Sequence, residues 1–122
     1  MPKTLLIVDD EASMRRLYSR VFSCEGYSCT LTGSLSEAKN LLGSNSYDLL
    51  ITDIQLGDGS GLELIELAKT FSGTKTIMIS GAFELADLRF MASQHDVPAY
   101  FGKPFRVDDL LDAVEDLLER RG

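Results

Sequence analysis

The sequence predicts a doubly wound α/β fold with a five-stranded parallel sheet. Three observations lead to this prediction: short apolar runs alternate with helical stripes, most of the runs end abruptly in a polar or charged residue, and the length suits one compact domain. The 122 residues are 44% apolar and 25% charged, which is ordinary for a globular domain with one core. Strands that alternate with helices form right-handed βα units, so we expect residues 1–122 to fold as a single domain with helices on both faces of the sheet.

Most of the strands are predicted from apolar runs that are too short to be helices. The five strands lie at residues 5–8, 28–31, 49–53, 76–80 and 99–102. Runs without alternating polar residues are typical of parallel strands that are buried on both faces. Four of the strands lead directly into reactive side chains, namely Asp9 with Asp10, Asp53, Ser80 and Lys103.

Apolar residues at helical spacing follow the first two strands. The first helix presents one apolar face, made of Met14, Leu17, Tyr18, Val21 and Phe22. The second helix begins at Ser34, because Ser34-Leu35-Ser36-Glu37 fits a capping box, and it ends near Gly43.

The remaining helices differ in how distinct their apolar stripes are. The third follows a glycine-rich loop at residues 57–61, and it is expected to bury Leu64, Ile65, Ala68 and Phe71. The fourth, residues 84–95, has the least distinct stripe, with Phe90 and Met91 adjacent, so at least one apolar side chain there should be poorly buried. The last, residues 107–120, begins with acidic residues and ends with basic ones, as the helix dipole favours.

Charge and cysteine content argue against several classes of protein. The net charge of −7 disfavours direct binding to nucleic acid or to an anionic membrane, because phosphate groups attract clustered Lys and Arg. The first apolar run, residues 5–8, is shorter than the core of a signal peptide and far shorter than a membrane span. Cys24 and Cys29 are too few for a disulfide framework and are expected to be reduced, partly buried thiols. Together these features predict a cytoplasmic protein.

The strand ends predict a metal site. For a sheet of this size the flavodoxin-like strand order 2-1-3-4-5 is expected, with ligands outside the carboxyl ends of the strands. In this order the first and third strands are neighbours, so Asp9, Asp10 and Asp53 converge. Three close carboxylates repel one another unless a cation neutralises them, and oxygen ligands suit Mg²⁺. We therefore expect Mg²⁺ at this edge of the sheet.

The same edge carries groups suited to phosphoryl transfer. Mg²⁺ commonly binds one or two carboxylates together with a phosphate oxygen, which leaves a carboxylate oxygen free to attack phosphorus. Asp53 stands alone at the end of its strand and is the predicted nucleophile. Lys103 can neutralise the transferring group, and the Ser80 hydroxyl can donate a hydrogen bond to it.

In combination these residues resemble the site of a bacterial two-component response-regulator receiver domain. The matching segments, in order on the expected elements, are Asp9-Asp10-Glu11, Asp53, Ser80-Gly81-Ala82 and Lys103-Pro104-Phe105. The resemblance extends from about Thr4 to Arg120. Each segment alone is weak evidence for the resemblance, but the set in this order is specific to the family.

The resemblance implies a function and a role for each matching residue. Asp53 would accept a phosphoryl group from a histidine kinase or a histidine phosphotransfer protein, with Ser80 and Lys103 contacting that group. Mg²⁺ would be held by Asp9, Asp10 and Asp53 and by the backbone carbonyl of Gln55. The domain would be a signalling switch and not an enzyme in the ordinary sense, since it would catalyse only its own phosphorylation and dephosphorylation.

The resemblance also implies how the signal leaves the site. Tyr100 fits the switch aromatic of the family, which moves inward when Ser80 is drawn toward the phosphate. The face formed by residues 84–95, 99–102 and 107–120 would then bind an output protein or form a homodimer. The Lys103–Pro104 peptide bond is often cis in such domains.

Two departures from the family pattern stand out. Gly57 occupies a position that usually holds proline, so a looser loop is expected after Asp53. Ser80 replaces the commoner threonine, which keeps the hydroxyl and removes a methyl group. Neither change removes a required chemical group.

Simpler interpretations exist for single residues. Asp10 or Glu11 could merely cap the helix that follows. Ser80 could be a turn residue and Lys103 a solvated surface lysine. His95 is interpreted as an exposed residue at a helix end.

Three other functions compete with a phosphorylated switch. A phosphatase with an aspartyl-phosphate intermediate would carry Asp two residues after Asp53, where this chain has Gln55. An FMN-binding flavodoxin would need a hydroxyl-rich and glycine-rich loop in place of Asp9-Asp10-Glu11, which would repel phosphate. A receiver-like module that binds partners without being phosphorylated remains the alternative, although the intact set of Asp, Ser and Lys argues against it.

Overall fold

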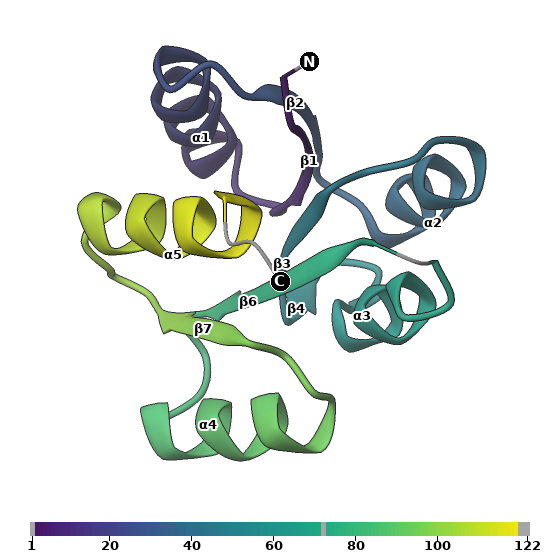
Figure 1. The fold of residues 1–122 in the computed structure, drawn as a ribbon. Helices are drawn as coiled ribbons and strands as arrows, with labels where there is room; N and C mark the ends of the chain where they lie inside the picture. Colours follow the sequence, from purple (N-terminus) through teal and green to yellow (C-terminus); the bar gives the residue numbers. More distant parts are fainter. Residues whose placement is uncertain (1, 72, 120–122) are drawn as a thin grey trace.

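A central sheet of five parallel strands organises the chain, whose computed structural model describes residues 2–71 and 73–119 (Figure 1). The strands of this sheet are β1 (Thr4–Val8), β2 (Ser28–Thr32), β3 (Leu49–Asp53), β6 (Lys75–Ser80) and β7 (Ala99–Gly102). Their order is β2-β1-β3-β6-β7. This confirms the predicted fold and the predicted order 2-1-3-4-5, since β6 and β7 are the fourth and fifth strands of the sheet.

Five helices and one small hairpin complete the described residues. The helices are α1 (Ala12–Cys24), α2 (Leu35–Ser44), α3 (Leu62–Ala68), α4 (Leu85–Gln94) and α5 (Val107–Glu119). The predicted end of the last helix, Arg120, lies outside the described residues. The hairpin consists of β4 (Gln55–Leu56) and β5 (Gly59–Ser60), paired antiparallel, and it was not predicted.

The sheet separates two hydrophobic cores. Strands β1, β3, β6 and β7 contribute side chains to both cores, whereas β2 contributes to one of them. In β1, Leu5 and Ile7 face one core while Leu6 and Val8 face the other, because successive side chains point to opposite faces of a strand. Helices α1 and α5 cover the first face, and α2, α3 and α4 cover the second (Figure 1). The side chain of Phe22 in α1 is fully buried, and burial of such a side chain stabilises the fold by about 2 kcal/mol.

The cap of α2 is formed only in part as predicted. The Ser34 hydroxyl accepts a hydrogen bond from the backbone N–H of Glu37 at 3.1 Å. The Glu37 carboxylate does not turn back to Ser34 but accepts a hydrogen bond from the hydroxyl of Thr32 at the end of β2. The capping box is thus half formed, because a neighbouring strand offers Glu37 another donor.

Three sequence predictions about burial were wrong. Phe71 is 38% exposed, because α3 ends at Ala68 and the backbone N–H and hydroxyl of Thr70 both donate to the carbonyl of Leu67. Cys24 is exposed at the end of α1, whereas Cys29 is partly buried as expected. His95 is partly buried, and its Nδ1 lies 2.6 Å from Oε2 of Glu66.

The prediction of poor burial in the fourth helix is confirmed. In α4, Leu88 and Ala92 face the core, whereas Leu85 and Phe90 are 62% and 64% exposed.

Among the described residues, no helix combines the length and apolar character needed to cross a membrane.

Candidate functional site

The predicted site residues meet at the carboxyl edge of the sheet, because of the strand register. Val8 pairs with Thr52, Asp53 pairs with Ile79, and Ser80 pairs with Gly102. The residues that end or follow these strands therefore lie side by side. They line a cavity of about 370 Å³ together with part of the β4–β5 hairpin. The residues lining it are Asp10, Glu11, Asp53, Gln55, Leu56, Ser80, Gly81, Ala82 and Lys103.

Lys103 is bound by three carboxylates. Its Nζ lies 2.8 Å from Asp9 Oδ2, 2.8 Å from Glu11 Oε1 and 2.9 Å from Asp53 Oδ2. The Lys103 side chain is only 14% exposed. Burial lowers the pKa of Lys103, but the three carboxylates outweigh this effect and the pKa lies above its ordinary value. Lys103 is therefore a charged member of the site and not a solvated surface lysine.

Asp53 is buried although it carries a charge. Burial raises the pKa of its carboxyl above the ordinary value, and this effect exceeds the opposing effects of Lys103 and of the Gln55 N–H. Its Oδ1 accepts the backbone N–H of Gln55 at 3.1 Å, and its Oδ2 faces Lys103. The nearby carboxylate of Asp9 adds to the shift. An additional cation at this edge would relieve the repulsion.

Asp9 is buried, and it accepts hydrogen bonds from four donor groups. Its Oδ1 accepts the Glu11 N–H at 3.0 Å, while its Oδ2 faces both Lys103 and, at 3.4 Å, the hydroxyl of Tyr18. Its backbone carbonyl accepts a hydrogen bond from Arg15 at 2.8 Å. These contacts fix the direction of the carboxylate.

The three aspartates fit a magnesium ion. One carboxylate oxygen from each of Asp9, Asp10 and Asp53 lies within 4.8 Å of the others. Asp9 and Asp53 are buried and Asp10 is exposed, so the cluster opens to solvent on one side. All donors are oxygen atoms, the set that Mg²⁺ prefers. Gln55, the first residue of β4, lines the same cavity.

Ser80 and Tyr100 occupy the predicted elements. Ser80 is fully buried, and its Oγ accepts the backbone N–H of Ala82 at 3.1 Å. Tyr100 in β7 is partly buried and packs against the core that α2, α3 and α4 cover. The Lys103–Pro104 peptide bond is cis.

Two residues of the site had no predicted role there. Glu11 makes no side-chain cap to α1, and its carboxylate binds Lys103 instead. Tyr18 had been predicted only as a core residue, yet its hydroxyl faces Asp9. Its ring stacks with the rings of Phe22 and Phe105. A hydroxyl on the apolar face of the first helix was the signal that could have identified Tyr18.

The loop after Asp53 is tied down at several points, although Gly57 had suggested a looser loop. The hairpin pairs Gln55 with Ser60 and Leu56 with Gly59. The Asp58 carboxylate accepts the backbone N–H groups of two residues of α2.

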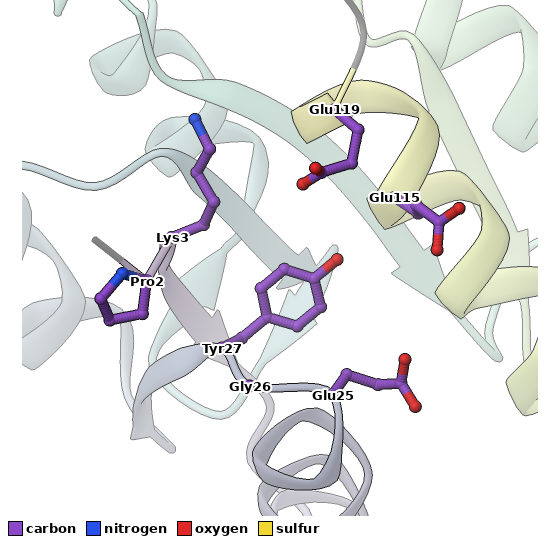
Figure 2. Close-up of a pocket in the computed structure, with 7 residues that line it drawn as sticks. All are labelled: Pro2, Lys3, Glu25, Gly26, Tyr27, Glu115 and Glu119. Carbon is purple, nitrogen blue, oxygen red and sulfur yellow. The ribbon is translucent and has the colours of Figure 1, made fainter.

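A second cavity, of about 480 Å³, lies at the opposite end of β1 (Figure 2). Figure 2 shows the ring of Tyr27 between α1 and α5, with three glutamates around it, Glu25, Glu115 and Glu119. Burial raises the pKa of Tyr27, and these three glutamates raise it further. No predicted site residue lines this cavity, among the residues that the structure describes.

Known proteins match this chain over nearly its whole length. The chain is 32% identical over 116 residues to the transcriptional regulatory protein PmrA of Pectobacterium parmentieri, covering 95% of this chain but 52% of that protein. It is 27% identical over 118 residues to sporulation initiation phosphotransferase F of Bacillus subtilis (strain 168), covering 97% of this chain and 95% of that protein. The chain thus spans about half the length of the first relative and nearly all of the second.

A solved structure also resembles this chain along nearly its whole length. A CheY-like response regulator receiver domain protein from Methanospirillum hungatei JF-1 superposes with a TM-score of 0.89 at 28% identity, covering 98% of this chain and 95% of that one. The family model described as the response regulator receiver domain matches residues 5–115. Proteins of this family act in two-component signalling and generally bind Mg²⁺ through an acidic cluster. Since this match covers most of the chain and includes the acidic cluster, the chain belongs to the response regulator receiver domain family.

Proposed function

We propose that the chain is a phosphorylation-driven signalling switch in which Asp53 accepts a phosphoryl group from a histidine kinase or a histidine phosphotransfer protein. The observation that carries this proposal is the meeting of three carboxylates and one partly buried lysine at an open cavity. An Asp53 oxygen would attack phosphorus while the bond from phosphorus to the donor's histidine nitrogen breaks, and that nitrogen would keep the electron pair. The name of the phosphotransferase relative agrees with this class of reaction.

The side chains around Asp53 suit the charge that develops during transfer. Lys103 Nζ already lies 2.9 Å from Asp53 Oδ2, so it would contact a phosphoryl group attached there. Ser80 Oγ accepts a hydrogen bond from Ala82, which leaves the hydroxyl hydrogen to be donated to a phosphoryl oxygen. Asp9, Asp10, Asp53 and the Gln55 carbonyl would hold Mg²⁺, which supplies charge neutralisation when bound.

The output would leave through α4, β7 and α5. Tyr100 is partly buried on β7, next to α4, and the exposed Leu85 and Phe90 give α4 an apolar surface. A shift of Ser80 toward a phosphoryl group would favour an inward position of Tyr100 and so change this face. The face would bind an output protein or a second copy of the chain. The cytoplasmic location of the protein stays a prediction.

The test is incubation with Mg²⁺ and acetyl phosphate, followed by intact mass measurement. We expect a gain of one phosphoryl group that requires Mg²⁺ and is lost with a chelator. Asp10→Ala should slow the gain and raise the Mg²⁺ concentration that it requires. If neither acetyl phosphate nor a phosphohistidine protein adds the group, the chain is a partner-binding module that acts without phosphorylation.

A comparison of NMR spectra tests the output route. Beryllofluoride with Mg²⁺ mimics an aspartyl phosphate, and we expect its addition to shift signals of Tyr100 and of α4. Shifts confined to the loops around Asp53 would contradict this route.

A further inference from the structure

The β4–β5 hairpin begins at the predicted phosphoacceptor. At its base, the backbone N–H of Gln55 donates to Asp53 Oδ1 at 3.1 Å, and the N–H of Gly61 donates to the carbonyl of Ile54 at 2.7 Å. A Cβ on Gly61 would clash with the backbone carbonyl oxygen of Asp53, so the returning chain passes close to the backbone of Asp53. The hairpin therefore supplies a backbone N–H group that faces the Asp53 carboxylate.

The turn of the hairpin is anchored to a different element. Asp58 Oδ1 accepts the backbone N–H of Leu35 at 2.8 Å, and its Oδ2 accepts that of Ser36 at 3.1 Å. These are the first two residues of α2, whose N–H groups have no acceptor within the helix. A carboxylate at this end is also favoured by the helix dipole. The two N–H groups hold the pKa of Asp58 below its ordinary value.

The hairpin also lies close to α2 and to the acidic cluster. A Cβ on Gly59 would come within 2.5 Å of Leu35 Cδ2, which shows how closely the hairpin approaches α2. A Cβ on Gly57 would lie 3.8 Å from Asp10 Oδ2, so the turn runs beside a predicted metal ligand. Hence one short segment lies beside both Asp53 and Asp10.

We propose that Asp58 is a positioning residue, which holds the β4–β5 hairpin on α2 and thereby keeps Gln55 beside Asp53 and Gly57 beside Asp10. For its effect on metal binding and phosphorylation, this inference rests on the proposed function. Asp58 does not line the cavity at Asp53, so it acts through the hairpin backbone. The nearby ion pair of Lys39 and Glu63 joins α2 to α3 and does not hold the turn.

The direct test is Asp58→Ala, with Mg²⁺ affinity measured by calorimetry and backbone amide exchange measured across residues 55–60. We expect faster exchange in the hairpin and an affinity for Mg²⁺ that is roughly tenfold weaker, as for other residues that orient metal ligands. Phosphorylation by acetyl phosphate should need more Mg²⁺ but recover its rate at saturating Mg²⁺. Unchanged exchange and unchanged Mg²⁺ affinity would overturn the inference.

Two further variants separate the hydrogen bonds that Asp58 accepts from the effects of its charge and of the cap of α2. Asp58→Asn removes the charge but keeps one carbonyl acceptor, so it should restore most of the hairpin protection and of the Mg²⁺ affinity. If it protects the hairpin yet binds Mg²⁺ as weakly as Asp58→Ala, the effect is one of charge and the inference is wrong. Ser34→Ala removes the other cap of the same helix end and leaves the Asp58 contact, so it should keep the affinity of the original protein. Equal weakening by Ser34→Ala would also overturn the inference.

The failure of this inference can be distinguished from failure of the proposed function. A chain that binds Mg²⁺ more weakly after Asp58→Ala, but never gains a phosphoryl group, contradicts the proposed function and supports the role of Asp58. A chain that is phosphorylated normally after Asp58→Ala, at every Mg²⁺ concentration, contradicts the role of Asp58 in the reaction.

Discussion

The two ends of the central sheet both gather acidic side chains, but in different surroundings. At the carboxyl edge, Asp9 and Asp53 are 1% and 7% exposed. At the amino edge, Glu25, Glu115 and Glu119 are exposed around Tyr27 (Figure 2). Water screens the repulsion among the glutamates, whereas the aspartates must be neutralised by Lys103 and by backbone N–H groups. The candidate site thus lies where the fold buries acidic residues together, and not simply where acidic residues are numerous.

The largest effect should come from removing the carboxylate of Asp53. Asp53→Ala should abolish the gain of a phosphoryl group from acetyl phosphate, because the proposed nucleophile is gone. The matched variant at the amino edge, Glu115→Ala, should be phosphorylated like the original protein. Intact mass distinguishes the two, and phosphorylation that persists in Asp53→Ala would refute the assignment of the phosphoacceptor.

Loss of the shared cation should be the next largest effect. Lys103→Met keeps most of the aliphatic stem but leaves Asp9 and Asp53 buried without their counterion, which should lower the free energy of unfolding by about 3 kcal/mol at neutral pH. The same change at the amino edge, Lys3→Met, should alter it by no more than about 0.5 kcal/mol. Urea denaturation measures both. Equal changes in the free energy of unfolding would show that burial of charge does not distinguish the two edges.

The pH dependence of stability should reveal the burial of Asp53. Its pKa is raised in the folded protein, so the folded state binds the proton more tightly and the charge destabilises the fold at neutral pH. The neutral variant Asp53→Asn should raise the free energy of unfolding by about 1 kcal/mol at pH 7. The gain should disappear as the pH falls below about 4, where the carboxyl is protonated in both states.

The control for this experiment is again at the amino edge. Glu115→Gln neutralises an exposed carboxylate and should change the free energy of unfolding by less than about 0.5 kcal/mol. Urea denaturation across the pH range measures both variants. A gain from Asp53→Asn that grows with acidification would have the wrong sign and would contradict the raised pKa.

The smallest expected effect concerns two tyrosine hydroxyls. Tyr18→Phe removes the long hydrogen bond to Asp9 Oδ2 but keeps the stacked ring, so it should cost about 0.5–1 kcal/mol of stability and weaken Mg²⁺ binding slightly. Tyr27→Phe at the amino edge should leave Mg²⁺ binding unchanged. Calorimetry with Mg²⁺ tests both, and a loss that is equal in the two variants would remove Tyr18 from the site.

The sequence predicted what depends on local pattern and on sheet geometry. Strands, their order and the convergence of Asp9 with Asp53 follow from apolar runs and parallel pairing. Contacts that depend on helix ends and on loop paths were not predicted, among them Glu11 with Lys103 and Asp58 with α2. Residue spacing carries no signal for side chains that meet across distant segments. That residues 1–122 form a single domain stays a prediction.

The strand β7 limits how two copies of this chain can associate. It lies at the edge of the sheet and is only four residues long, with Pro98 directly before it and Pro104 two residues after it. Exposed edge strands can pair with strands of other molecules, but short strands flanked by proline offer few backbone donors for such pairing. A homodimer through this face would therefore be held by the side chains of α4 and α5, and not by a sheet that continues from one molecule into the next.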